Sequence, residues 1–387
     1  MAAFSITGVI LSPSNQCRLQ TLPLPVRGFS HYSFSLTKTH STFPFPVNKY
    51  LSIFNNNTMT SATLIIAAPP QVTAATTADS DVHKFASASI TSSWAEFAEN
   101  VSGEWDGFGA DFTVEGKPIE LPESVVPEAY REWEVKVFDW QTQCPTLAQS
   151  HDNGPSLKYK TVMLLPTVGC EADAATTYSI QERDLTAHHY SPLAYQSTGC
   201  YVALWPVITN QINGANKSIE LEHCLIDPRD KQSRVRIIQV LELQESALKL
   251  QNIRIFVEQW YGPFRNGDQL GGCAIRDSAF AATQPLKGSQ VSGVWQGLSA
   301  VATFPSSHSM IQQLGTESVC ESIRSEGDLI LLPKQLWCSV TRAENNETCC
   351  EVGWLLDEGR AITSKCTFSS TAKLKEIAIA CETAVSA

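Results

Sequence analysis

The pentapeptide VSGEW at Val101–Trp105 returns almost unchanged as VSGVW at Val291–Trp295. Each copy runs into a further glycine and an apolar stretch, DGFGADF with Gly107 after the first copy and QGLSAVATF with Gly297 after the second. Because the pentapeptides differ in one letter only and the following glycine also agrees, we interpret them as copies of one duplicated structural element. The alternative is a single large β-sandwich in which the repeat is a coincidence.

The residue types of the repeat fit a strand that closes one end of a small β-barrel. A glycine tolerates the sharp bend of such a strand, and an aromatic side chain two residues later points to the same side and fills the end of the barrel. We therefore assign structural roles to Gly103 and Trp105 in the first copy, and to Gly293 and Trp295 in the second. This arrangement resembles the calycin and lipocalin superfamily. It predicts an all-β fold with two antiparallel calycin-like β-barrels in tandem.

Most of the chain after the first copy alternates between apolar and polar residues, with turn residues roughly every 8–12 positions, as in antiparallel barrels and sandwiches. In the middle of the chain we expect strands over 159–168, 200–208, 233–245 and 248–260. The last of these changes its apolar phase around Gln251–Asn252, which predicts a β-bulge or a tight turn. Strand-like segments crowd the C-terminal part, where RAENNET at Arg342–Thr348 predicts a hairpin.

The chain is long enough for more than one domain. We expect residues 1–70 to be a disordered chloroplast transit peptide, residues 90–282 to form a first β-barrel domain with insertions, and residues 283–387 to form a second, smaller β-barrel domain. The boundary lies in the linker-like stretch Ala281–Gln290. An incomplete second barrel would leave an open sheet edge that needs cover, and the first domain is placed to provide it.

Two further features of the first domain are predicted. A short helix over Ser93–Asn100 precedes the first strand, because Trp94, Phe97 and Val101 share one helical face. Other linker-like stretches lie at Gln149–Ser156 and Asn210–Ser218. The first of these suits an insertion into the first barrel.

The N-terminal segment has the composition of a targeting peptide. No Asp or Glu precedes Asp79, whereas Ser, Thr, Pro and Asn are abundant and four basic residues are scattered among them. An acid-free, hydroxyl-rich start without a compact apolar core is typical of an organelle transit peptide. Its Ser and Pro content and its few arginines favour a plastid, so we expect the mature protein in the chloroplast stroma. The alternative is a disordered tail without an address.

The charge of the remaining chain restricts its partners. All 39 acidic residues lie from Asp79 onward, together with 24 of the 28 Lys and Arg residues, which gives a formal net charge of about −15. Such a chain repels phosphate backbones, so we expect no nucleic acid as a partner, whereas a basic protein surface is allowed. No apolar run approaches the length of a membrane-spanning helix, and we expect a monomer without an integral membrane segment.

The cysteines do not form a recognisable metal or redox motif. The twelve cysteines include no C-x-x-C pair, and the side chains of the adjacent Cys349 and Cys350 point to opposite faces of a strand. Several cysteines occupy the apolar phase of expected strands, for example Cys381 in EIAIACE. We interpret them as reduced cysteines that serve as small hydrophobic residues, rather than as disulfide partners or metal ligands.

No motif supplies an active site. G-x-S-x-G, a P-loop, G-x-G-x-x-G and H-E-x-x-H are all absent. His188, His189, His223 and Cys224 are the strongest candidates for a metal or an acid–base role, but we interpret the histidines as surface or edge-strand residues. SSHS at Ser306–Ser309 is interpreted as a polar loop. We expect no enzyme, no catalytic residue, no cofactor and no bound metal.

A barrel can also hold a small ligand. The aromatic residues available to line such a cavity are Trp133, Phe138, Trp140, Trp205, Trp260 and Tyr261. The same residues fit a solid core or a protein interface, where Trp and Tyr are enriched. We favour a role in the core or at an interface.

Two stretches together resemble a known family. SSWAEFAENVSGEWDGFGADFTVEGKPIELPESVVPEAYREWEVKVFDWQTQC, read with the C-terminal LPKQLWCSVTR and EVGWLLDEGR, resembles a family of calycin-type proteins from plants and cyanobacteria. Its plant members include a biogenesis factor for the chloroplast ATP synthase. The resemblance covers about residues 92–382. It implies a stromal assembly factor of two β-barrels that engages the β and γ subunits of the catalytic head, and it places no catalytic or partner-binding residue.

Two other functions share the expected fold. One is a plastid lipocalin-like carrier of a lipid, a carotenoid or a tetrapyrrole, and the other is a bilin-attachment enzyme. Co-purification from stroma distinguishes these hypotheses. Co-purified head subunits indicate an assembly factor, whereas a coloured or lipid-loaded protein indicates a carrier. For an assembly factor, the acidic and apolar stretch Glu115–Glu134 predicts an acidic client surface around an apolar centre.

Overall fold

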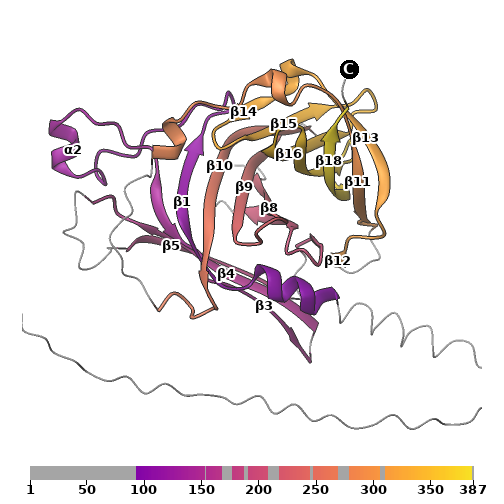
Figure 1. Ribbon diagram of the computed structural model, residues 1–387, viewed down its shortest axis with the longest axis horizontal. Coiled ribbons are helices and arrows are strands. Elements are labelled where there is room, and N and C mark those ends of the chain that lie inside the picture. The colour runs from indigo at the N-terminus through magenta and orange to yellow at the C-terminus, as the bar shows by residue number, and fades with distance from the viewer. Residues whose placement is uncertain are drawn as a thin grey trace, which may run out of the picture. The chain divides into compact units, whose positions relative to one another are not determined.

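A computed structural model describes residues 93–152, 154–167, 177–186, 191–207, 218–244, 247–268, 279–305 and 310–385. The expected transit peptide lies outside these residues. The described part of the chain is built from strands in two barrel-like antiparallel sheets (Figure 1), which confirms the all-β prediction. In this part, no helix combines the length and the hydrophobicity that crossing a membrane requires.

The first sheet follows the order β12-β6-β7-β8-β9-β10-β1-β2-β4-β3, and β5 also pairs with β4. Its pairs are antiparallel except that between β12 and β6, which is parallel. Its strands are β1 (Glu104–Phe112), β2 (Trp140–Gln143), β3 (Thr146–His151), β4 (Gly154–Leu164), β5 (Thr177–Thr186), β6 (Leu193–Tyr195), β7 (Tyr201–Val207), β8 (Ser218–Ile226), β9 (Ser233–Gln244), β10 (Ala247–Gly262) and β12 (Ile311–Gln313).

The second sheet follows the order β13-β11-β18-β17-β16-β15-β14 and comes entirely from the C-terminal part of the chain. Its strands are β11 (Gly293–Thr303), β13 (Ser318–Arg324), β14 (Ile330–Leu332), β15 (Leu336–Arg342), β16 (Thr348–Asp357), β17 (Arg360–Phe368) and β18 (Leu374–Ala384). Within the described residues, neither sheet closes on itself by pairing its end strands.

Helices are few and short in the described residues. Residues 93–101 are helical and precede β1, as predicted, and bury Trp94, Phe97 and Val101. The short helix α2 (Glu128–Glu132) was not predicted from the sequence. Three 3-10 turns, η1 (Ala279–Ala282), η2 (Gly288–Gln290) and η3 (Glu326–Asp328), complete the set.

The alternation of side chains explains most strands, and two local predictions are confirmed. The pairing of β10 with β9 shifts register between Leu250 and Asn252, where the apolar phase changes. RAENNET joins β15 to β16 as a hairpin. One prediction is wrong: Gln149–Ser156 is no linker, because Gln149 and Ser156 lie opposite each other in the hairpin of β3 and β4.

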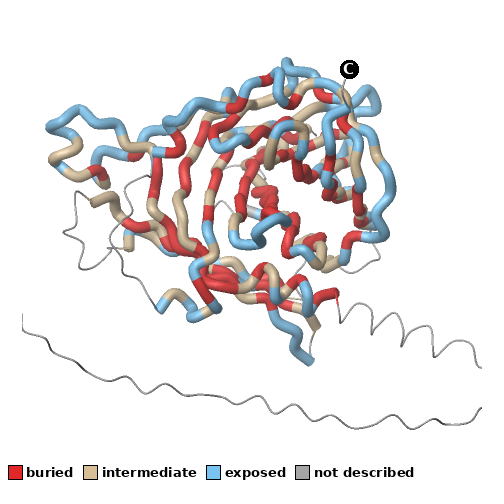
Figure 2. Tube along the Cα trace, viewed as in Figure 1, coloured by how far each residue is buried: buried red, intermediate tan, exposed pale blue. Residues whose placement is uncertain are grey.

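The two sheets share one hydrophobic core. It joins buried residues of β8, β9 and β10 to buried residues of β15, β16, β17 and β18. Polar bonds cross the same boundary, from His223 on β8 to Ser364 on β17, and from Gln239 on β9 to the Ser339 carbonyl on β15. The connection from β11 to β13 adds β12 to the edge strand β6 of the first sheet. Figure 2 shows the buried residues following the strands.

Candidate functional site

The first Gly-x-Trp element begins β1. Gly103 has a φ of 149°, a backbone conformation that residues with a side chain rarely adopt. Trp105 is fully buried, and its indole Nε1 donates to the Val101 carbonyl at 3.0 Å. The guanidinium of Arg234 lies over the Trp105 ring, 4.3 Å from the ring centroid. The element is therefore part of the core, and it offers no free polar group of Trp105 to a ligand.

The second Gly-x-Trp element begins β11 in the same way. Gly293 has a φ of 112°, and Trp295 is 1% exposed. The Trp295 Nε1 donates to the Val291 carbonyl at 2.9 Å, and the Arg324 guanidinium lies 5.6 Å from the ring centroid. All four residues to which the sequence assigns structural roles thus lie at the starts of two comparable strands.

A buried hydrogen-bond network surrounds Glu222 on β8. Its carboxylate accepts bonds from the Tyr159 hydroxyl, from the Tyr201 hydroxyl at 2.9 Å and from the Trp205 Nε1 at 2.7 Å. Arg236 pairs with the same carboxylate at 3.3 Å. Burial and the Glu222 charge raise the pKa of both tyrosines well above its ordinary value, so the phenols stay protonated and keep donating.

The network continues along β9 and β10. Arg236 also pairs with Glu258 at 2.9 Å, and Arg234 pairs with Glu258 at 2.6 Å. Burial alone would raise the pKa of Glu258, but the charges of Arg234 and Arg236 hold it below its ordinary value. Arg236 therefore bridges the two buried carboxylates of Glu222 and Glu258. The cluster consists of two carboxylates and two guanidinium groups whose charges balance, and we assign it a structural rather than a catalytic role.

His223 and Cys224 do not form a site for chemistry in the structure. Both are fully buried, and the His223 ring contacts the Ser364 hydroxyl at 2.6 Å and Gln239 at 3.3 Å. Burial lowers the pKa of His223 to about 3, so the ring is neutral and acts as a polar bridge between the sheets. It is no surface or edge-strand residue, which corrects that interpretation. His188, His189 and Ser306–Ser309 lie outside the described residues.

Among the residues that the structure describes, no group of three or more His, Cys, Asp or Glu side chains is placed to hold a metal ion. The nine described cysteines are all free thiols, and six of them are buried. Cys349 is half-buried while its neighbour Cys350 is buried, as expected for opposite faces of one strand.

The strongest surface feature is the segment 113–139 between β1 and β2, which we call the acidic arm. It holds seven acidic and three basic residues, a formal net charge of −4. Figure 1 shows the arm with α2 extending away from β1, and its tip is exposed in Figure 2. Trp133 is 62% exposed, and Val135, Ile119 and Val114 are further exposed apolar residues of the arm. Six consecutive residues, 131–136, are exposed.

The acidic arm is an ordered element with its own small core. Leu121 and Val126 pack with Trp140 of β2 in a separate buried cluster. The Leu121 N–H donates to the Val137 carbonyl at 2.8 Å, which closes the base of the arm. At the tip, Trp133 lies 6.3 Å from Tyr130 in an edge-on arrangement.

This arrangement presents an aromatic side chain on a fixed backbone with carboxylates on both sides. Glu132 and Glu134 flank Trp133 in sequence, and Glu128 lies five residues before it at the start of α2. The Trp133 N–H donates to the Ala129 carbonyl, so the residue carrying the ring is held in place. A large exposed aromatic within a polar rim is typical of protein-binding surfaces, because Trp supplies much of the affinity at interfaces. The arm is therefore the candidate partner-binding site.

The aromatic residues proposed to line a cavity separate in the structure. Trp140 and Trp205 are buried, Phe138 and Trp260 are half-buried, and only two of the set, Trp133 and Tyr261, are exposed. Trp140 stacks on Tyr178 with ring centroids 4.7 Å apart. The six residues therefore do not share one environment, and Trp133 and Tyr261 are the members available to a partner.

Sequence reasoning recognised the acidic stretch but not its fold. Pro118, Pro122 and Pro127 interrupt the strand pattern after β1, and such clustered prolines signal an irregular excursion. That signal could have located the arm. The buried network of Glu222 and Arg236 was missed, because alternating charges on a strand usually indicate a solvated face.

Comparisons with known proteins add a structural likeness only. No family model matches the chain, and no curated protein matches it. A crystal structure of a protein with unknown function from the DUF3598 family of Nostoc punctiforme is similar, with a TM-score of 0.45 and 12% sequence identity. The similarity covers 76% of this chain and 99% of that chain. A likeness at this level assigns no function.

Proposed function

We propose that the protein is a stromal assembly factor that promotes assembly of the chloroplast ATP synthase head by binding its unassembled β and γ subunits. The observation that carries the proposal is the acidic arm, which holds the exposed Trp133 on a fixed backbone among carboxylates. The choice of client comes from the resemblance of the sequence to the plant and cyanobacterial calycin-type family. The plastid location comes from the composition of the N-terminal segment.

The proposed action follows from the physics of unassembled subunits. Surfaces that become interfaces in a complex are apolar and prone to aggregation while they are exposed. A factor that covers such a surface protects it, and the larger final interface then displaces the factor. An acidic rim speeds the encounter with a basic or mixed client face, while the apolar centre around Trp133 contributes most of the affinity.

The runner-up is a plastid carrier of a lipid, a carotenoid or a tetrapyrrole. The buried network favours the assembly factor, because the space around Glu222 is filled by Tyr159, Tyr201, Trp205 and Arg236. An apolar ligand in that place would leave these polar groups without their bonds, at a cost of about 1–3 kcal/mol for each group. The carrier would need a cavity elsewhere.

Binding of purified β and γ subunits to the mature protein tests the proposal. Trp133→Ala should weaken binding at least ten-fold, since exposed aromatic anchors dominate interface energies. Tyr261→Ala is the matched control, because Tyr261 is 63% exposed and lies on β10 rather than on the arm. The control should bind as the parent protein does. Absence of binding by the parent protein, or equal loss in both variants, would contradict the proposal.

Charge is tested separately on the same arm. The variant carrying Glu128→Gln, Glu132→Gln and Glu134→Gln should associate more slowly, with dissociation comparatively unchanged. A control variant with three exposed glutamates elsewhere replaced by glutamine, Glu99, Glu344 and Glu358, should keep the parent rate. Raising salt from about 50 to about 500 mM should slow the parent protein, because the Debye length falls from roughly 14 Å to roughly 4 Å. An association rate indifferent to salt would leave the acidity with a role in solubility alone.

A further inference from the structure

The end strand β13 of the second sheet has an exposed apolar face. Val319 is 80% exposed and Ile323 is 73% exposed, the highest values among the large hydrophobic residues of the described chain. The two residues point to the same side of β13, with Glu321 between them. In the described residues, β13 pairs with β11 and with no other strand.

Three other strands at or near the sheet ends are protected. At the edge of β14, the Leu286 N–H donates to the Leu332 carbonyl at 3.0 Å. The backbone at Gly116 also lies against this strand. The edge of β6 is covered by β12. Strand β5 pairs with β4 alone among the described strands, and it carries the charged run Glu182–Asp184, a feature with which natural proteins discourage further pairing. Among these ends, β13 combines an open edge with exposed apolar side chains.

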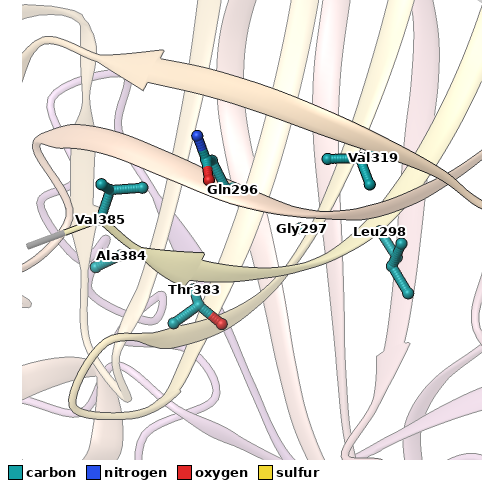
Figure 3. Close-up of a pocket in the computed structure, with 7 residues that line it drawn as sticks. All are labelled: Gln296, Gly297, Leu298, Val319, Thr383, Ala384 and Val385. Carbon is teal, nitrogen blue, oxygen red and sulfur yellow. The ribbon is translucent and has the colours of Figure 1, made fainter.

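The exposed face of β13 continues across its neighbours. Val319 lies opposite Leu298 on β11, which is 48% exposed, and Leu298 lies opposite Cys381 on β18. A shallow depression of about 410 Å³ spans these strands, with Gly297 and Val385 among its lining residues. Figure 3 shows Val319 and Leu298 together at one end of the depression and Val385 toward the other.

The charge on this face is negative and uncompensated. Glu321 accepts a bond from the Gln296 amide at 3.0 Å, and Glu317 precedes β13 at its exposed start. Neither carboxylate forms an ion pair with a described residue. Arg324, the one basic residue of β13, is buried and pairs with Glu382 at 2.6 Å. A cation on a partner would therefore meet an unpaired carboxylate at Glu321.

We propose that β13 binds an extended segment of a partner protein, which adds to the second sheet as an antiparallel strand. The pattern of the recognised segment follows from strand geometry. Residues that lie opposite in antiparallel strands share a face, so Glu321 selects Lys or Arg at the centre of the segment. Val319 and Ile323 select apolar residues two positions to either side, and backbone bonds to the open edge supply affinity without further side-chain selection.

The same geometry argues against a second copy of this chain as the occupant. Antiparallel pairing of two β13 strands that sets Val319 against Ile323 also sets Glu321 against Glu321. Like charges directly opposite each other are destabilising. This docking site lies on a different sheet from the acidic arm and does not depend on the assembly-factor proposal.

A synthetic heptapeptide tests the site, Thr-Val-Thr-Lys-Thr-Val-Thr, labelled with a fluorophore and compared with the same peptide carrying Glu at its centre. The mature protein should bind the Lys peptide at least ten-fold more tightly than the Glu peptide. Glu321→Lys should reverse this preference, and Val319→Thr with Ile323→Thr should weaken both complexes. Glu344→Lys, on the exposed turn between β15 and β16, is the charge control and should change neither. Should Glu321→Lys not fold, Glu321→Gln should abolish the preference.

Hydrogen exchange locates the peptide. Bound Lys peptide should slow exchange at amides of β13 and leave those of β5 unchanged. Equal affinity of both peptides for the parent protein, or protection elsewhere without protection of β13, would overturn the proposal. Self-association that protects β13 in the absence of peptide would also overturn it, in favour of a second copy. The arm variant with Glu128, Glu132 and Glu134 replaced should bind the peptide normally, which separates this result from the test of the proposed function.

Discussion

The two Gly-x-Trp elements share one geometry, but the arginines that pair with their buried glutamates come from different sides of the element. In both, the Trp indole donates to the carbonyl four residues earlier, at 3.0 Å from Trp105 and 2.9 Å from Trp295. In both, the next glycine lies opposite a glutamate of the neighbouring strand, Glu258 in the first sheet and Glu382 in the second. An arginine pairs with each of these glutamates and lies over the Trp ring.

The glycines after the two tryptophans explain part of the repeat. A Cβ on Gly107 would lie 2.0 Å from the Val257 carbonyl oxygen, and one on Gly297 would lie 2.0 Å from that of Cys381. A side chain at either place would force the strands apart. The backbone therefore requires the glycine in both copies, independently of the surrounding charges.

The arginines differ in origin and number. Arg234 comes from β9, beyond the glutamate-bearing strand β10, and Glu258 has Arg236 as a second partner. Arg324 comes from β13, on the opposite side of β11, and forms ion pairs with both Glu351 and Glu382. The comparison teaches that strand geometry fixes the positions of Gly, Trp and Glu, while the cation can come from either side. The first sheet buries more charge as a result.

The largest effect should come from truncating the tryptophans. Trp105→Ala and Trp295→Ala should each lower the free energy of unfolding by about 3–5 kcal/mol, as for large aromatic side chains in cores. Trp105→Ala should cost more, because it also uncovers Arg234, which lies closer to its ring than Arg324 does to Trp295. Urea unfolding measures both, with the exposed Trp133→Ala as the control. If either variant leaves the free energy of unfolding unchanged, the two elements are not structurally equivalent.

Removing the glutamates should separate the two elements more clearly. Glu258→Gln leaves Arg234 and Arg236 buried with one carboxylate fewer, and should cost about 3–5 kcal/mol. Glu382→Gln should cost about 1–2 kcal/mol, because Arg324 keeps Glu351 as a partner. Urea unfolding of the two single variants checks the order. A larger loss in Glu382→Gln would mean that the number of counter-charges does not set the cost.

The second sheet also buries free thiols. On the second sheet, Cys350 and Cys366 lie opposite each other, and burial raises the pKa of both thiols well above its ordinary value. Cys350→Ala should cost about 1 kcal/mol, since it removes a buried group of about methylene size. In the native protein both thiols should react with a thiol reagent only as fast as the protein unfolds, whereas the half-buried Cys320 reacts sooner. Fast labelling of Cys350 would show that this face is open to water.

The alternation of apolar and polar residues made most strands predictable, because side chains in strands point alternately to two faces. The bulge in β10 was predictable for the same reason, since an extra residue reverses the alternation. The pairing of β12 with β6 was not predictable, because a three-residue parallel strand carries no periodic signal. Its position depends on the path of the chain between β11 and β13.

The candidate site was predictable only as composition. The acidic and apolar character of Glu115–Glu134 is visible in the sequence, but the exposure of Trp133 depends on local bonds such as that from Leu121 to Val137. The buried network was hidden for the opposite reason. Arg234 and Arg236 alternate with apolar residues as on a solvated strand, and only the approach of Glu258 from β10 shows that this face is buried.

The last prediction is an effect that depends on pH, and it concerns Asp139, the last residue of the acidic arm. Its carboxylate accepts the Ala281 N–H at 3.3 Å and so holds η1 in the connection between the two elements. Burial raises the pKa of Asp139 to about 7, although the N–H groups of Ala281 and Phe280 act to lower it. Between pH 4 and pH 7, roughly, the folded protein binds the proton more tightly than the unfolded chain does.

Stability should therefore fall as the pH rises through this range, and the full penalty should be present above about pH 7. Asp139→Asn keeps an acceptor for Ala281 but removes the buried charge. The variant should be more stable than the parent at pH 8, and the difference should vanish near pH 4. Urea unfolding at several pH values measures it, with Glu358→Gln as an exposed control. A stability difference between variant and parent that does not change with pH would show that Asp139 does not titrate in this range.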